Sequence, residues 1–156
     1  MINKLKFDID KYKFRELVSE AFGVDDLEKI HEMKQNWIKD EYKHLSVHNE
    51  NTTKFHVEFY KKLNDNWTEF YNTYDNFIYS EIVPLFDKKF HYQYLPTFRI
   101  HLPFDNQAIH TWHYDSDQLH RHPIGEINIW LPLTRCYKTN TMWIESEPFK
   151  LDFKPL

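Results

Sequence analysis

Residues 126–134 read EINIWLPLT, with an aliphatic side chain at every second position of the first six. Side chains of a β-strand point alternately to its two faces, so this pattern predicts a strand with one apolar face. The stretch TFRIHL at positions 97–102 repeats the alternation between two prolines and predicts another strand. TMWIE at 141–145 indicates a third. The second half of the chain is therefore expected to form a sheet.

The residues before position 89 follow helical spacing instead. In FRELVSEAF, positions 14–22, apolar residues recur at steps of three and four before Gly23, which predicts a helix with a glycine C-cap. Similar patterns predict helices starting at Asp25 or Asp26, at Thr52 or Thr53, and over 67–82. Helices followed by short strands indicate an α+β fold, in which a helical part, 1–88, packs on a mainly antiparallel β part, 89–156.

Composition limits the function classes. A chain of 156 residues with 18% aromatic residues is expected to form a single domain, 1–156, with a real core. Its net charge of −4, with both signs interspersed, argues against nucleic acid and favours a small-molecule substrate. A single cysteine, Cys136, excludes an internal disulfide and fits a reducing compartment. No apolar run predicts a signal peptide or membrane span, so the expectation is a cytoplasmic protein with no membrane partner.

The most informative short motif is His113-Tyr114-Asp115. On an extended strand, residues two apart point to the same side, so His113 and Asp115 present an imidazole and a carboxylate together. Two histidines and one carboxylate on one face of the metal make up the iron site of non-haem oxygenases. An ordinary solvated strand face explains the same alternation, because a histidine two residues before an aspartate is a common pattern.

Other polar residues of the predicted strands could contribute to the same cavity. Arg99 could bind an anionic co-substrate or simply reach solvent, and His101 lies on the same face. Asn128 and Trp130 share the polar face of the later strand, where Trp130 could equally belong to the core. A different hypothesis is a zinc or nickel site made by histidines alone, namely His110, His113, His120 and His122.

Four stretches together resemble the Fe(II)/2-oxoglutarate-dependent oxygenases, in their streptomycin-biosynthesis-type, phytanoyl-CoA-dioxygenase-like branch. They are YLPTFRIHLP (94–103), WHYDSD (112–117), GEINIWLPLT (125–134) and NTMWIES (140–146), and the resemblance is dense over residues 90–153. It implies a double-stranded β-helix, or jelly roll, with His113 and Asp115 as ligands of Fe(II). The implied activity is a dioxygenase that uses 2-oxoglutarate to hydroxylate a small molecule. We assign Arg99 and Asn128 to cofactor binding, and His101 and Trp130 to substrate binding.

The chain departs from the family pattern in one respect. A distal histidine and an arginine that binds 2-oxoglutarate would lie beyond Leu156. The expected jelly roll is therefore incomplete, and its open sheet edge could pair with a second copy or a complementing chain. The third ligand would come from water, from His120 or His122, or from a partner chain. The alternative is a truncated or degenerate module without catalysis that needs such a partner.

Overall fold

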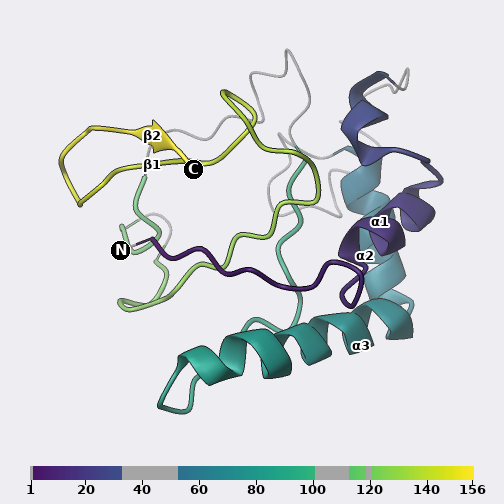
Figure 1. Ribbon diagram of the computed structural model, residues 1–156, viewed down its shortest axis with the longest axis horizontal. Helices are drawn as coiled ribbons and strands as arrows, with labels where there is room; N and C mark the ends of the chain where they lie inside the picture. Colours follow the sequence, from purple (N-terminus) through teal and green to yellow (C-terminus); the bar gives the residue numbers. More distant parts are fainter. Residues whose placement is uncertain (1, 33–52, 101–112, 119–120) are drawn as a thin grey trace.

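The computed structural model of this protein describes residues 2–32, 53–100, 113–118 and 121–156 (Figure 1). Among these residues, three α-helices lie in the first half of the chain, and β1 and β2 lie near the C-terminal end. The continuous helical run from α3 through η4 to η5 follows one side of the molecule in Figure 1. The elements are α1 (Phe14–Phe22), the 3₁₀ helix η1 (Leu27–Glu32), α2 (Lys54–Asn64), α3 (Thr68–Phe77), the π-helix η4 (Ile78–Ile82), the 3₁₀ helix η5 (Val83–Leu85), β1 (Trp143–Ile144) and β2 (Lys154–Pro155).

The C-terminal end of α1 confirms the glycine cap. Gly23 has a φ of 62°, in the left-handed region that favours glycine. The N–H groups of Gly23 and Val24 donate to the carbonyls of Glu20 and Ser19, at 3.1 and 3.0 Å. These bonds satisfy carbonyl groups that the end of a helix would otherwise leave without partners. The chain can therefore turn sharply out of α1 into η1.

The N-terminal end of α2 confirms Thr53 as the cap, one of the two threonines predicted for it. The Thr53 hydroxyl accepts from the N–H groups of Phe55 and His56, at 3.1 and 3.3 Å. The Thr53 N–H in turn donates to His56 Nδ1 at 3.2 Å, which completes a capping box. Thr53 is only 3% exposed, so water cannot replace these bonds easily.

The variant Thr53→Ala should therefore unfold more easily than the wild type. We expect its free energy of unfolding to fall by about 1–2 kcal/mol, because two amide groups at the start of α2 lose their acceptor. Urea unfolding followed by far-UV circular dichroism measures this difference. Thr53→Ser retains the hydroxyl and should lie close to the wild type; an equal loss in both variants would show that the hydroxyl bonds are not the cause.

Aromatic side chains dominate the core between the helices. Phe55 is fully buried and Phe59 is 2% exposed. The ring of Phe98 stacks on Phe59, with centroids 4.5 Å apart, and the Phe98 N–H donates to the Tyr60 hydroxyl at 3.0 Å. Residues 96–100, which precede the predicted site, are thereby anchored to α2. The buried apolar residues are Tyr12, Phe14, Leu17, Val18, Phe22, Leu27, Ile30, Phe55, Phe59, Leu63, Phe70, Phe77, Ile78 and Ile82.

One predicted strand is present in the structure. β1 lies inside the predicted segment 141–145 and pairs antiparallel with β2, with Trp143 opposite Pro155 and Ile144 opposite Lys154. Residues 97–100 and 126–131 do not form strands. Only some of the alternating apolar side chains face inward: Phe98 and Leu131 pack against the core, whereas Ile127 and Ile129 are 62% and 50% exposed. A strand also needs a hydrogen-bonded neighbour, and the described residues provide none for these two segments.

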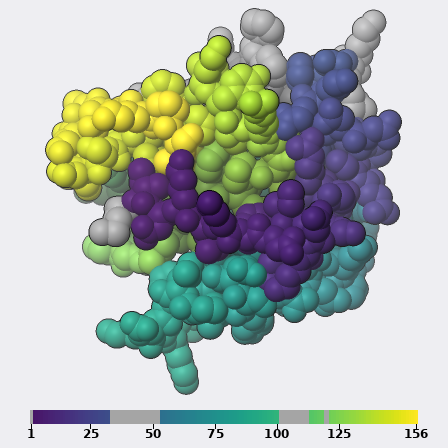
Figure 2. All heavy atoms as spheres, in the orientation of Figure 1, coloured from purple at the N-terminus to yellow at the C-terminus, as the bar shows by residue number. Residues whose placement is uncertain are grey.

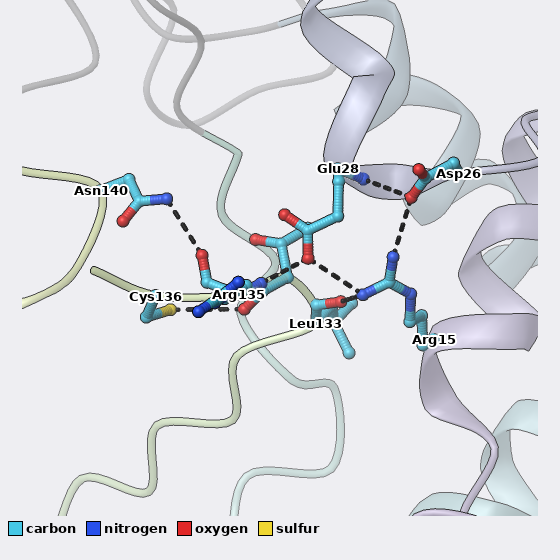
Figure 3. A network of polar contacts seen from close by, with 8 residues as sticks. Arg15, Asp26, Glu28, Leu133, Arg135, Cys136 and Asn140 are labelled. Carbon is cyan, nitrogen blue, oxygen red and sulfur yellow. Dashed lines mark hydrogen bonds and ion pairs between the residues drawn. The ribbon is translucent and has the colours of Figure 1, made fainter.

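A polar junction fastens the helical part to the later segment (Figure 3). Arg15, on α1, donates to Asp26 Oδ1 at 2.9 Å, to Glu28 Oε1 at 3.1 Å and to the Leu133 carbonyl at 3.3 Å. The Arg135 N–H donates to the same Glu28 oxygen at 2.6 Å.

Figure 2 shows the N-terminal segment crossing the face of the molecule between the α3 side and the later part of the chain.

Cys136 lies at the edge of this junction, where its Sγ donates to the Thr134 carbonyl at 3.4 Å. Partial burial, followed by the nearby Glu28 carboxylate, raises the pKa of the Cys136 thiol. A raised pKa keeps the thiol protonated at neutral pH, and a thiol is a much weaker nucleophile than a thiolate.

None of the described helices is long and apolar enough to cross a membrane.

Candidate metal site

His113 and Asp115 lie close together, although residues 113–118 form a turn and not the expected strand. His113 Nε2 lies 3.5 Å from Asp115 Oδ1, and the two side chains are 28% and 39% exposed. This separation is longer than a normal N–H···O hydrogen bond. Two donor atoms bound to one metal ion at about 2.1 Å, with an angle of about 90–110°, lie roughly 3.0–3.5 Å apart. The pair therefore has a separation that suits two adjacent ligands of one ion.

Asn128 determines how the Asp115 carboxylate is oriented. Its side-chain amide donates to Asp115 Oδ2, so Oδ1 is the oxygen that faces His113. The sequence predicted that Asn128 binds the cofactor. In the structure, the Asn128 amide instead contacts Asp115, a candidate metal ligand. A ligating carboxylate in a metal site is commonly held by such a hydrogen bond.

Two tight turns bring Asn128 back to Asp115. The Asp117 N–H donates to the Tyr114 carbonyl at 2.9 Å, and the His122 N–H donates to the Asp115 carbonyl at 2.8 Å. A second turn follows at Gly125, whose φ of 93° is strained for residues with a Cβ. Nothing lies within 4 Å of the position that a Cβ would occupy at Gly125, so the backbone angle, and not a lack of space, favours glycine there.

A hollow of about 160 Å³ opens beside the carboxylate. This volume is well below the ~300–1,000 Å³ of typical ligand pockets, so it suits one small group and not a whole substrate. Its wall combines the carboxylates of Asp115 and Glu126 with a turn of the backbone. The lining residues are Tyr114, Asp115, Ser116, Pro123, Ile124, Gly125, Glu126 and Asn128.

The other predicted site residues are not gathered around this pair. Arg99 is exposed and, within the described part of the chain, forms no hydrogen bond or ion pair with Asp115 or Asn128. Trp130 is 42% exposed. His101 lies outside the described residues, as do His110 and His120 of the histidine-only hypothesis.

His122, a predicted source of a third ligand, has a different neighbour. Its Nδ1 lies 2.8 Å from Glu126 Oε2, and both side chains belong to the turn that leads to Asn128. Among residues 2–32, 53–100, 113–118 and 121–156, no three histidine, cysteine or carboxylate side chains are grouped closely enough to hold one metal ion. The described part of the site therefore contains two candidate ligands.

Glu145 is a polar residue near the motif whose contacts the sequence pattern did not reveal. It directly follows β1, and its Oε2 accepts a hydrogen bond from the Tyr114 hydroxyl at 2.9 Å. Tyr114 stands between the two candidate ligands. The only available signal is a carboxylate at the end of a predicted strand, which by itself does not identify a partner 31 residues away.

Comparison with known proteins gives one informative similarity. No protein-family model and no solved structure matches the chain. Over 150 residues, 96% of its length, the chain is 29% identical to the streptomycin biosynthesis protein StrG of Streptomyces griseus. The matched region covers 67% of StrG. Along nearly all its length, the chain is thus similar to about two thirds of a protein named for an antibiotic biosynthetic pathway.

Proposed function

We propose that this chain is a hydroxylase domain of the non-haem Fe(II)- and 2-oxoglutarate-dependent type, acting on a small molecule in a biosynthetic pathway. The observation that carries the proposal is the approach of His113 Nε2 to Asp115 Oδ1 at 3.5 Å. Similarity to StrG supports the biosynthetic context. The resemblance of the motif stretches to the oxygenases supports the chemistry.

His113 and Asp115 would hold the metal. Bound Fe(II) would supply dioxygen activation, with 2-oxoglutarate oxidised to succinate and CO₂ while a substrate C–H bond becomes C–OH. Asn128 keeps the Asp115 carboxylate turned toward His113 through its amide hydrogen bond. Because a primary amide has two N–H donors and one carbonyl acceptor, Asn128 can hold Asp115 and still contact a co-substrate.

The proposal includes three further assignments. Arg99 would bind a carboxylate of 2-oxoglutarate, and His101 and Trp130 would contact the substrate. The third ligand would be water, His120, His122 or a side chain from a partner chain; at His122 the ligating atom would be Nε2, since Nδ1 faces Glu126. The proposed fold is a double-stranded β-helix, with residues 97–102 and 126–131 as strands when they pair with neighbours.

The direct experiment measures succinate formed from 2-oxoglutarate by the purified chain under air. We expect succinate when Fe(II) is present and none when Fe(II) is replaced by Zn(II), since zinc has no redox chemistry. Asp152→Asn is the matched control, because it removes a carboxylate that accepts from Ser146 and not from the metal pair, and its turnover should equal that of the wild type. A chain that binds iron and forms no succinate would contradict the proposal.

The competing function is a module without catalysis that acts only with another polypeptide. Exposed aliphatic side chains favour it: Ile124, Ile127 and Ile129 are 96%, 62% and 50% exposed. Such exposed side chains, on residues that belong to neither described strand, suit contact with a second chain. In that case the isolated chain forms no succinate with any added metal.

A further inference from the structure

Tyr114 lies between His113 and Asp115 in the chain and is held by contacts with the segment that follows β1. Its hydroxyl donates to Glu145 Oε2 at 2.9 Å and accepts from the Phe149 N–H at 2.9 Å. The Tyr114 ring also contacts the Phe149 ring, with centroids 5.0 Å apart. Three contacts thus fix the residue between the two candidate ligands.

The Glu145 carboxylate organises the segment that makes these contacts. Besides the tyrosine hydroxyl, its Oε2 accepts from the Phe149 N–H at 2.9 Å and its Oε1 from the Leu151 N–H at 3.0 Å. Phe149 and Leu151 have φ values of 69° and 58°, a left-handed conformation that is costly for residues other than glycine. Charge-assisted bonds to one carboxylate offset that cost.

We propose that Glu145 is a positioning residue for the metal pair: by holding Tyr114, it fixes the backbone on which His113 and Asp115 are mounted. This inference rests on the proposed function. The separation of His113 Nε2 and Asp115 Oδ1 depends on the backbone angles of residue 114, because that residue connects them. Without the Glu145 bond, Tyr114 keeps only its contacts with Phe149, and the backbone that joins the two ligands is held less firmly.

The test uses Co(II) added to the metal-free chain as a spectroscopic probe. We expect Glu145→Gln and Tyr114→Phe each to weaken Co(II) binding roughly tenfold, within the range seen when a supporting partner of a metal ligand is removed. In Glu145→Gln, an NH2 group takes the place of one of the two carboxylate oxygens, and an NH2 group cannot accept a hydrogen bond from another N–H or O–H donor. The double variant should bind no more weakly than either single one, because both substitutions break the same link. The visible spectrum at saturating Co(II) should also change, which loss of overall stability alone would not cause.

Asp152→Asn is the matched control within the same segment. Asp152 accepts from the Ser146 N–H at 3.0 Å and from its hydroxyl at 2.8 Å, and neither bond involves Tyr114. We expect this variant to keep the wild-type affinity and spectrum. If Glu145→Gln and Tyr114→Phe bind Co(II) like the wild type, or if Asp152→Asn weakens binding equally, the inference is overturned and the proposed function stands. If the wild type binds no better than Asp115→Ala, the metal assignment itself fails, and the inference with it.

Discussion

Asp115→Ala should weaken Fe(II) binding by roughly a hundredfold and abolish iron-dependent succinate formation, because removing one of two ligands leaves a single imidazole to hold the ion. The expected loss exceeds that at any supporting residue. Asp115 also accepts a hydrogen bond from the Asn128 amide, so the substitution breaks that bond as well. Anaerobic titration with Fe(II), read by equilibrium dialysis, measures the affinity, and a succinate assay measures the turnover.

Two further variants separate ligation from orientation. Asn128→Ala retains the carboxylate and removes only the amide that orients it, so its binding should be weakened roughly tenfold. Asp152→Asn should match the wild type in both measurements, because its carboxylate accepts from Ser146 and not from the metal pair. Equal affinity and turnover in Asp115→Ala and the wild type would exclude Asp115 as a ligand.

Phe59→Ala should cause the largest loss of stability, about 3–5 kcal/mol in the free energy of unfolding. The side chain is 2% exposed and contacts Phe70 and Phe98, at centroid distances of 5.4 and 4.5 Å. Truncation removes apolar burial and leaves a cavity that these rigid rings cannot fill. Since Phe98 would lose the ring on which it stacks, residues 96–100 should also separate from α2. Urea unfolding monitored by circular dichroism gives the free energy, and hydrogen exchange at the Phe98 amide reports the local separation.

Leu85→Ala is the control for this substitution. Leu85 ends the helical run and is 59% exposed, so its truncation should change the free energy of unfolding by no more than about 0.5 kcal/mol. A loss at Phe59 as small as that at Leu85 would mean that the aromatic cluster does not hold the helices together.

The helix ends were predictable because their causes are local. Gly23 was identified as the C-cap of α1 from its position after the last apolar residue, and its left-handed φ confirms this. Thr53 was one of two candidate caps for α2, and its hydroxyl bonds to Phe55 and His56 identify it. Each motif involves residues within a few positions of one another, so spacing alone contains the information.

The strands were less predictable because a strand depends on a distant partner. Residues 141–145 contain β1, which pairs with β2. Residues 126–131 show a clearer alternation, and yet Ile127 and Ile129 are 62% and 50% exposed and no ladder forms. Alternation records which side chains could face a core; it does not record whether another segment lies alongside. The double-stranded β-helix and the roles of Arg99 and Trp130 therefore stay proposals.

The amino-acid sequence by itself identified the helices α1, α2 and α3 and the ends of α1 and α2, since each depends on residues only a few positions apart. Only the tertiary structure placed Asn128 on the Asp115 carboxylate and Glu145 on Tyr114, across 13 and 31 residues. The physical reason is that a hydrogen bond between distant residues requires the turns and packing of the intervening chain, and no local periodicity specifies those.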